Sequence, residues 1–516
     1  SFHLLLMYVF PQCPAWMNMV FPVLINYSLR MMPCVLAGLL LLRTSSMQKM
    51  IAAMYTLHLP QGFIIAMSTT LRYFPALKEE FVHINAAMKL QNISWASRLE
   101  CTVVPLIVSA VNTSDEIAAA AVARGIENPG KKTTSHGDFR LVDNDFGNIW
   151  NSYSGDRRIK EMIKFENVNV TIQEKRILSD VNLEIQDGEF VLICGESGCG
   201  KTTMTKLING LIPHFVRDVS VDGTITVCGK NVAEMPMYEI AELVGSVFQN
   251  PRTQFFYTNS NAEMAFGLEN RGVEPEYIRK RIKNTINELD IEKLEDRNVF
   301  SMSGGEKQLL AFASVYAMNP QIYVLDEPSA NLDIAAMEKL SERMKVIKEK
   351  GHTVIVAEHR LAWIQKFADR IIYIKEGRIE QEFTSDEFKA LSDLRREQMG
   401  LRSIIPEQIQ IPEITVNSED AVLQVCNLSG KRKKQMIFEN ISLSAGEGDI
   451  IGITGENGAG KSTFCNCLCG LLKPKNGEIL YKGKRLSEKA RTKLFGMVMQ
   501  EVNHQLFSDS VKNECL

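Results

Sequence analysis

Two glycine-rich stretches contain the residue types that hold phosphate groups. Glycine lets successive backbone N–H groups turn toward phosphate oxygens at a helix N-terminus. The lysine of such a loop supplies a positive charge to the phosphates, and the hydroxyl that follows it binds Mg²⁺. Because the pattern occurs twice, we reject a chance match. The candidate residues are Gly195, Glu196, Ser197, Gly198, Cys199, Gly200, Lys201, Thr202 and Thr203 in GESGCGKTT, and Gly455, Gly460, Lys461, Ser462 and Thr463 in GENGAGKST.

A strand and a helix must hold each loop in place. The apolar run Phe190–Cys194 predicts a buried strand before the first loop. The residues after Lys201 predict a helix that ends at Gly210, because Pro213 cannot continue it. Two further apolar runs, Ile322–Leu325 and Thr353–Ala357, show no alternation. Such runs are typical of parallel strands that are covered on both faces, so an α/β fold is predicted.

Two adjacent carboxylates, Asp326 and Glu327, follow the run that begins at Ile322. Open α/β sheets place ligand chemistry at the carboxyl ends of their strands. One carboxylate can hold Mg²⁺ there, and the other can polarise an attacking water. An acidic pair elsewhere is usually a solvated surface, but this position favours a metal role for Asp326 and a catalytic role for Glu327.

The motif Ser303-Gly304-Gly305 separates this chain from kinases and small GTPases. Together with the two loops, the LDEPSANLD run that ends at Asp333 and His359 after the second apolar strand, it resembles the nucleotide-binding domain of ATP-binding cassette (ABC) proteins. The resemblance implies ATP and Mg²⁺ as cofactors and hydrolysis of ATP. It also implies that the Ser303-Gly304-Gly305 motif opens a helix, and that these residues close on the γ-phosphate held by a second ABC domain, paired head to tail in cis or in trans.

The same resemblance assigns roles to single residues that would more often be structural if taken alone. It implies that Gln249 links Mg²⁺ and the water to the membrane partner, that His359 contacts the γ-phosphate and that Asp333 spans the domain pair. The metal candidates are Thr202, Gln249, Asp326, Ser462 and Gln500. The chain departs from the family because no aromatic residue lies between Phe165 and Phe190 to stack on adenine.

The N-terminal third has a different composition. Ser1–Leu29 and Met31–Leu42 contain no Lys, Arg, Asp or Glu, and about 20 apolar residues can span a bilayer. We expect a first span in which the chain begins, a turn near Pro11–Pro14 and a second span within Met17–Leu42. A signal peptide is not expected, because there is no basic leading segment. A buried helical core is the alternative.

Two helical stretches follow the apolar region. Leu71–Phe81 predicts an interfacial amphipathic helix. In the stretch that starts at Pro105, Arg124 stands where the helix dipole favours a cation, and Gly125 can end the helix. LRYFP, an Asp-Glu-x-Ala run and Ala123-Arg124-Gly125 resemble the transmembrane coupling protein of energy-coupling-factor transporters, the bacterial and archaeal importers of vitamins and transition-metal ions.

That second resemblance implies a docking role for one short motif. Ala123, Arg124 and Gly125 are expected to dock a coupling helix in a groove of an ATPase domain. At the corresponding place in the first helix the chain has Leu90-Gln91-Asn92 instead.

The chain is therefore predicted to be multidomain, with an N-terminal α-helical membrane and coupling domain followed by ABC-type α/β P-loop NTPase domains. The predicted bounds are 1–135 for the transmembrane and coupling domain, 136–159 for a linker, 160–390 for a complete ATPase domain, 391–419 for a second linker and 420–516 for the N-terminal part of a second ATPase domain. We expect both ends of the chain to be cut.

Length and composition agree with a modular protein. A chain of 516 residues is too long for one core and suggests about three domains. The net charge of −3 gives no reason to expect nucleic acid as a partner. Eleven Cys without regular spacing indicate a reduced, cytosolic setting for the ATPase domains.

The predicted function is the energising module of an importer in a bacterial or archaeal cell membrane. ATP-driven closure of ATPase domains on the cytoplasmic face would move coupling helices and reorient a separate substrate-binding membrane protein. Membrane lipid is a further expected partner. Two alternatives are a soluble twin-cassette ATPase of translation or DNA repair and a conventional ABC transporter cassette. The sequence does not name the solute, because in the resembling family a different polypeptide binds it.

Overall fold

The computed structural model describes residues 61–90, 98–130, 132–133, 161–330, 332–402, 421–432, 435–499, 505–507 and 510–512, and scattered residues between 27 and 60. The predictions for the first membrane span, the linker at 136–159, Gln91, Asn92 and Gln500 lie outside the described residues. Most of Met17–Leu42 does so as well.

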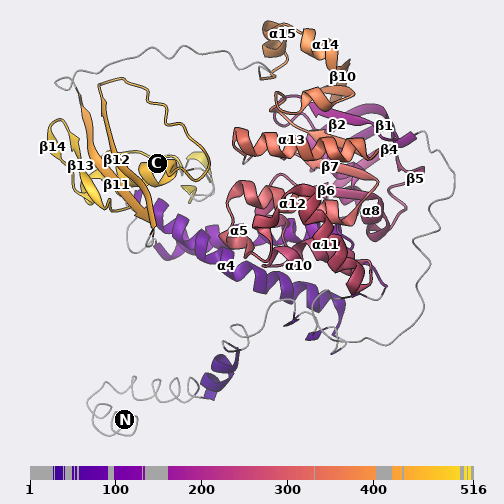
Figure 1. The fold of residues 1–516 in the computed structure, drawn as a ribbon, viewed down its shortest axis with the longest axis horizontal. Coiled ribbons are helices and arrows are strands. Elements are labelled where there is room, and N and C mark those ends of the chain that lie inside the picture. Colours follow the sequence, from indigo (N-terminus) through magenta and orange to yellow (C-terminus); the bar gives the residue numbers. More distant parts are fainter. Residues whose placement is uncertain are drawn as a thin grey trace. The chain divides into compact units, whose positions relative to one another are not determined.

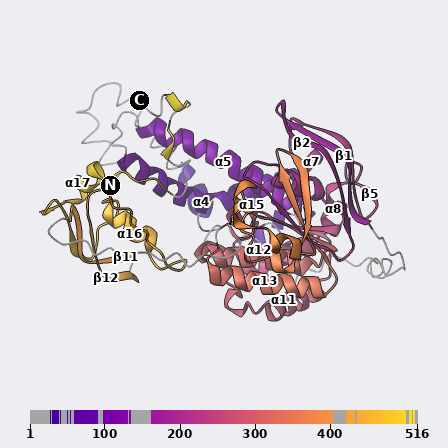
Figure 2. The ribbon, with the colours of Figure 1, turned by 90° about the horizontal axis from the view of Figure 1, so that it is seen from above.

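Two long helices precede the ATPase regions. They are α4 (Gln61–Leu90) and α5 (Arg98–Val122), which lie side by side in both views (Figures 1 and 2). The Thr102 hydroxyl of α5 donates to the Met88 sulfur of α4 at 3.6 Å. The predicted interfacial stretch Leu71–Phe81 is part of the continuous helix α4.

Helix α5 begins earlier than expected. Pro105 lies inside it and not at its start, because the apolar pattern already begins at Cys101. Among the described residues, one helical segment, Cys101–Val122, has the length and apolar composition that crossing a membrane requires. Its described side chains include exposed apolar residues such as Val104 and Ile107.

The first ATPase region contains a six-stranded sheet that positions the candidate site (Figure 1). Its strand order is β10-β9-β3-β8-β7-β6, and only the edge strand β10 is antiparallel. Every residue of β3, β7 and β8 is buried, which confirms the prediction of parallel strands covered on both faces. The strands are β3 (Phe190–Cys194), β6 (Val244–Val247), β7 (Ile322–Asp326), β8 (Thr353–Ala357), β9 (Arg370–Lys375) and β10 (Arg378–Thr384).

An antiparallel sheet with the order β2-β1-β4-β5 accompanies it. Its strands are β1 (Glu161–Ile172), β2 (Lys175–Gln186), β4 (Val219–Val227) and β5 (Lys230–Asn231). Helices α10, α11 and α12 pack against one another beside the six-stranded sheet (Figure 1). The helices of this region are α6 (Lys201–Ile208), α7 (Leu211–His214), α8 (Met237–Leu243), α9 (Pro251–Gln254), α10 (Ser260–Asn270), α11 (Pro275–Leu289), α12 (Gly304–Met318), α13 (Ile334–Glu349), α14 (Ser385–Ala390) and α15 (Asp393–Gln398).

Part of the segment expected to be a linker belongs to this first region. Ser392 caps α15 by accepting a hydrogen bond from Arg395 N–H. Met399 and Leu401 are buried in the same core as β3 and β7. The polar sequence around α15 hid this packing, because few apolar side chains carry it: Met399, Leu401 and the partly buried Leu391.

The second ATPase region has the sheet order β12-β11-β13-β14, which repeats the β2-β1-β4-β5 arrangement. A small core forms around Val425, Leu428, Phe438, Phe464, Cys467 and Ile479. Residues 450–455, which correspond to β3, lie in no strand. The elements are β11 (Leu423–Arg432), β12 (Gln435–Ala445), α16 (Lys461–Leu468), β13 (Asn476–Tyr481), β14 (Lys484–Arg485) and α17 (Glu488–Leu494).

Candidate functional site

The first phosphate loop joins β3 to α6. Gly195 has φ +148°, and a Cβ at this position would lie 2.2 Å from the Ile374 carbonyl oxygen, so only glycine fits. Gly200, with φ +111°, precedes the first residue of α6. The Lys201 ammonium is buried and donates to the carbonyl oxygens of Gly195 and Glu196, both at 2.9 Å. The loop is therefore closed around its own lysine.

A hydroxyl and a carboxylate meet at the foot of this loop. Thr202 Oγ1 donates to Asp326 Oδ1 at 3.1 Å. Asp326 is 6% exposed, and this burial, with the nearby charge of Glu327, raises the pKa of its carboxyl to about 6. The hydrogen bond from Thr202 opposes the rise. Thr202 and Asp326 thus place two oxygen ligands side by side. Burial leaves the carboxylate short of compensating positive charge, so this pair fits a hard cation such as Mg²⁺.

Three candidate residues converge beside Asp326. Gln249 Nε2 donates to Glu327 Oε2 at 2.6 Å, and His359 Nδ1 lies 3.7 Å from the same oxygen. Gln249 follows β6, Glu327 follows β7 and His359 follows β8. These strands are neighbours in the sheet, and the carboxyl ends of parallel neighbours meet at one edge. The sheet order therefore explains why these residues, distant in sequence, come together.

The sequence analysis missed Glu358. Its side chain is completely buried. Oε1 accepts hydrogen bonds from the backbone N–H groups of His359 at 2.8 Å and Arg360 at 3.0 Å, and Oε2 accepts one from Ser329 N–H at 3.3 Å. Glu358 thus ties the loop after β8 to the loop after β7. Its place at the end of an apolar strand, beside a candidate histidine, was the available signal.

Ser303 begins α12, as the resemblance implied for its motif. Its side chain accepts a hydrogen bond from Glu306 N–H at 3.3 Å, and Glu306 accepts one from Ser303 N–H at 2.8 Å, which is a capping box. Arg297 pairs with Glu306 at 2.5 Å. Ser303 itself is exposed, and Gly304 and Gly305 are the first residues of the helix.

Asp333 is the N-cap of α13. One carboxylate oxygen accepts a hydrogen bond from Ala336 N–H at 2.9 Å. The other accepts one from Asn457 N–H, in the second phosphate loop, at 3.0 Å. These backbone hydrogen bonds, led by that from Ala336, lower the pKa of the Asp333 carboxyl.

The second phosphate loop repeats the geometry of the first. Gly455 has φ +146° and Gly460 has φ +97°. Lys461 Nζ donates to the carbonyl oxygens of Gly455 at 2.6 Å and Glu456 at 2.8 Å. Ser462 is exposed, and Thr463 follows it in α16. No carboxylate is paired with Ser462 among the described residues, and Gln500 lies outside them.

The end of α5 places Arg124 at a helix C-cap. Gly125 N–H donates to Val122 O at 2.9 Å and Ile126 N–H donates to Ala121 O at 3.1 Å, which is the Schellman pattern. Gly125 has φ +73°, a conformation that costs glycine little. Ala123 and Ile126 are buried around the turn. Glycine therefore ends the helix directly after Arg124.

Arg124 is buried in a pocket of the first ATPase region. Its guanidinium pairs with Glu263, which is completely buried, and donates to the carbonyl oxygen of Gln254. The Phe266 ring lies 5.5 Å from the guanidinium carbon. Asn270 Nδ2 donates to the Arg124 carbonyl oxygen at 3.1 Å. A buried arginine held by a carboxylate, a carbonyl and an aromatic face is a specific docking contact.

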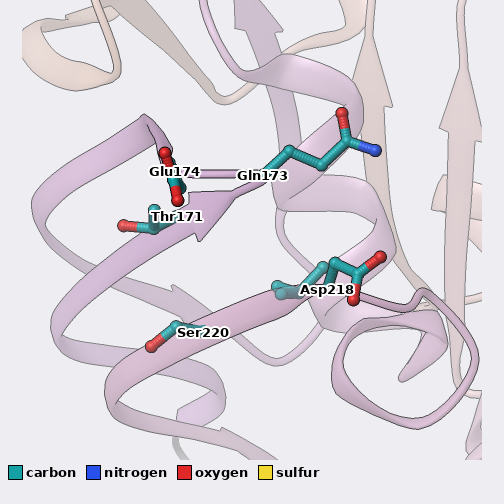
Figure 3. Close-up of a pocket in the computed structure, with 6 residues that line it drawn as sticks. Thr171, Gln173, Glu174, Asp218 and Ser220 are labelled. Carbon is teal, nitrogen blue, oxygen red and sulfur yellow. The ribbon is translucent and has the colours of Figure 1, made fainter.

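A surface pocket lies away from all these residues, at the turn between β1 and β2. Figure 3 shows its polar lining. Gln173 N–H donates to Asp218 O at 3.2 Å across it. The lining residues are Thr171, Gln173, Glu174, Asp218, Val219 and Ser220. None of them is a predicted site residue.

Two families match the chain in separate segments. The family described as ABC transporter matches residues 178–330 and 438–514, and the family described as Cobalt transport protein matches residues 22–134. The second match covers both long helices and the Arg124 motif. It argues against the soluble twin-cassette alternative, in which this segment would be a helical core of another kind.

Individual proteins show similarity over most of the chain. A putative ABC transporter ATP-binding protein of Treponema denticola is 43% identical over 362 residues, which cover 69% of this chain and 74% of that protein. The putative HMP/thiamine import ATP-binding protein YkoD of Bacillus subtilis is 31% identical over 387 residues, which cover 69% and 67%. The structure of cbiO1 from Clostridium perfringens, titled as part of the ABC transporter complex cbiONQ, aligns with a TM-score of 0.42 and 28% identity over 46% of this chain and 94% of that chain.

The two family matches, in the order membrane segment and then cassettes, agree with the docked helix and the phosphate loops. The chain belongs to the ABC transporter ATP-binding proteins and is an ATP-hydrolysing, membrane-associated energising module of the energy-coupling-factor type.

Proposed function

We propose that ATP hydrolysis at the first phosphate loop moves α5 and thereby drives solute uptake through a separate substrate-binding membrane protein. The observation that carries this proposal is the burial of Arg124 against Gln254 and Glu263, a few residues from Gln249. Gln249 in turn hydrogen-bonds Glu327. Helix α5 and the proposed catalytic carboxylate of Glu327 are thus connected through the chain segment between Gln249 and Gln254.

The residues of the first loop have separate roles in this proposal. Backbone N–H groups of Gly195–Gly200 and the Lys201 ammonium bind the phosphates. Thr202 and Asp326 would hold Mg²⁺, with Gln249 as a further ligand, and the bound ion would neutralise negative charge on the phosphates. Ser462 and Gln500 are the corresponding metal candidates beside Lys461.

Hydrolysis requires a water molecule that is polarised and correctly placed. Glu327 is the general base, because its Oε2 lies at the carboxyl end of β7 and already accepts a hydrogen bond from Gln249. His359, held by Glu358 through its backbone, contacts the γ-phosphate. Ser303, Gly304 and Gly305 bind the γ-phosphate on the opposite ABC domain, and Asp333 spans that domain pair.

The substrate class follows from relatives and not from a pocket in this chain. The family matched at residues 22–134 is described as Cobalt transport protein, and the Bacillus subtilis relative is named for HMP/thiamine import. We propose a vitamin-related solute or a transition-metal ion, bound by the separate membrane subunit. The ATPase regions lie on the cytoplasmic face of a bacterial or archaeal membrane, and the N-terminal segment contacts the lipid.

The direct test is uptake by a reconstituted complex. The protein would be purified from membranes with its small hydrophobic partner, and the partner and its ligand identified by mass spectrometry. Proteoliposomes should then accumulate that ligand only when ATP is supplied on the side of the ATPase regions. ATP hydrolysis without accumulation of any ligand bound by the partner would refute an import function.

Replacement of Arg124 tests the coupling contact. Arg124→Ala and Arg124→Glu should abolish uptake and leave basal ATP hydrolysis largely intact, because the guanidinium docks the helix and touches no nucleotide. Arg124→Glu should also be the more disruptive variant, since it would place a second carboxylate against the buried Glu263. Lys89→Ala, at an exposed residue in the last turn of α4, is the matched control. Normal uptake with Arg124→Glu would show that this contact does not transmit motion.

A further inference from the structure

The Gln254 side chain closes the base of the loop that carries Gln249. Its Oε1 accepts a hydrogen bond from Phe248 N–H at 3.0 Å, and its Nε2 donates to Ser246 O at 3.2 Å. The side chain is 1% exposed, whereas Gln249 and its neighbour Asn250 are exposed. The position of Gln249 therefore depends on two buried hydrogen bonds made by a residue that the sequence analysis did not select.

The second ATPase region contains the same pair of hydrogen bonds. Gln505 Oε1 accepts from Met499 N–H at 2.7 Å, and Gln505 Nε2 donates to Met497 O at 2.8 Å. The three residues have the same spacing as Gln254, Phe248 and Ser246. In both regions the partners contribute only backbone groups. The glutamine side chain therefore fixes the same loop geometry in both regions, although the surrounding side chains differ.

Helix α5 also contacts Gln254, through the backbone carbonyl of that glutamine. Arg124 donates to the Gln254 carbonyl oxygen and pairs with Glu263. Glu263 Oε2 also accepts hydrogen bonds from Phe256 N–H at 2.9 Å and Tyr257 N–H at 2.7 Å. Arg124 is therefore linked to both sides of the turn that follows α9. It bonds the Gln254 carbonyl oxygen directly, and it reaches the N–H groups of Phe256 and Tyr257 through Glu263. Charge-assisted hydrogen bonds are short and directional, so a displacement of Arg124 displaces Gln254.

We infer that Gln254 is a positioning residue that transmits movement of Arg124 to Gln249, and so to the hydrogen bond between Gln249 and Glu327. This inference rests on the proposed function. Gln254 touches neither nucleotide nor water in this role. It acts because its backbone is held by the docked helix while its side chain fixes the loop. A misplacement of about 1 Å can change a rate by roughly 100-fold, so a small movement suffices.

Two substitutions separate positioning from simple stability. Gln254→Met keeps the length and apolar body of the side chain and removes both hydrogen bonds, whereas Gln254→Glu keeps an oxygen acceptor for Phe248 N–H. Both variants would be made in the full chain, purified with its membrane partner. For Gln254→Met we expect KM for ATP to stay within about twofold while kcat falls about tenfold or more. Gln254→Glu should recover part of that loss as the pH is lowered, because only a protonated carboxyl can both accept from Phe248 N–H and donate to Ser246 O.

A double-mutant cycle tests the link to the docked helix. The measured quantity is the part of ATP hydrolysis that the membrane partner stimulates. Arg124→Ala and Gln254→Met should each lower this part about tenfold without abolishing it, and the double variant should lose no more than the larger single loss. Gln505→Met, which removes the same clamp from the second region, is the matched control. Its effect should combine independently with that of Arg124→Ala.

Three results would overturn the inference. They are additive effects of Arg124→Ala and Gln254→Met, a raised KM with unchanged kcat, and a loss of activity that a lowered melting temperature fully explains. Failure of the wild-type complex to take up any solute would instead contradict the proposed function. The ATPase cycle can still be measured in that case, so the two failures are distinguishable.

Discussion

The two phosphate loops have nearly the same backbone in very different surroundings. Gly195 and Gly455 have φ values of +148° and +146°, and Lys201 and Lys461 each donate to the same two loop carbonyls. The strand before the first loop is completely buried between β8 and β9. Before the second loop, Ile450 is 100% exposed.

This difference separates what the loop sequence determines from what the sheet adds. The loop conformation is local, because glycine permits the positive φ values and the lysine bonds carbonyls only a few residues away. The carboxylate that we propose to bind metal is not local, since Asp326 comes from β7 and reaches Thr202 only when the parallel sheet is assembled. The loop backbone thus forms from its own residues, and the sheet brings the candidate site residues of the first region to it.

The largest effect is expected at Glu327, the proposed general base, which has no counterpart beside the second loop among the described residues. Glu327→Gln should lower kcat about 100-fold or more while leaving ATP affinity nearly unchanged, because the amide keeps the shape and loses the charge that polarises water. Nucleotide binding and phosphate release would be measured in the full complex. Lys201→Ala is the contrasting variant and should weaken binding itself. Wild-type turnover of Glu327→Gln would remove Glu327 from the catalytic role.

A matched pair of glycine substitutions tests whether the surroundings distinguish the two loops. Gly195→Ala and Gly455→Ala should both incur about 1–3 kcal/mol of backbone strain. Gly195→Ala should cost more, because its Cβ would lie 2.2 Å from Ile374 O, whereas the nearest atom to a Cβ at Gly455 is Ala459 Cβ at 3.5 Å. Hydrogen exchange of the loop peptides in the intact protein measures both. Equal loss of protection at the two loops would contradict the comparison.

A further expected difference between the loops is a pH dependence of the first one. The pKa of Asp326 is raised to about 6 in the folded protein from an ordinary value of 3.8. The neutral carboxyl is therefore favoured by folding. Without metal, this stabilising contribution of about 3 kcal/mol is complete below pH 3.8 and is lost as the pH rises through about 6.

Metal binding should show the opposite trend, since Mg²⁺ requires the ionised carboxylate. Mg²⁺ affinity at the first loop should fall as the pH is lowered through about 6. Titration of Mg²⁺ with fluorescent nucleotide between about pH 5 and 7.5 would detect it. Asp326→Asn should abolish this dependence, and an unchanged profile in that variant would assign the effect to another group.

Much of the first ATPase region could be predicted from the sequence because its signals are local. Apolar runs located β3, β7 and β8, and the Ser303 motif located the start of α12. Gln254 could not be selected in the same way, and Glu358 had only its place at a strand end as a signal. Their importance lies in backbone groups that they bond after folding, and those groups leave no trace in residue type.

For α5 and its contact with the first ATPase region, too, only the local features could be predicted from the sequence. Gly125 and Arg124 predicted the end of α5 from local rules of helix termination. The partner of Arg124 was beyond such rules, because Glu263 is far away in the chain and reads as an ordinary charged residue of a helix. Likewise, α4 runs without a break through Leu71–Phe81, and the amphipathic pattern alone does not reveal its full length.

The capping box at Ser303 has a consequence for the proton of its hydroxyl. A serine hydroxyl carries one hydrogen to donate and two lone pairs to accept with. The cap uses the oxygen as an acceptor from Glu306 N–H, so the hydrogen stays available for a phosphate oxygen. Asparagine and aspartate are equally good caps, yet an aspartate would offer no hydrogen and would repel the phosphate. Serine is thus a residue that can hold the helix end and still give a hydrogen bond away.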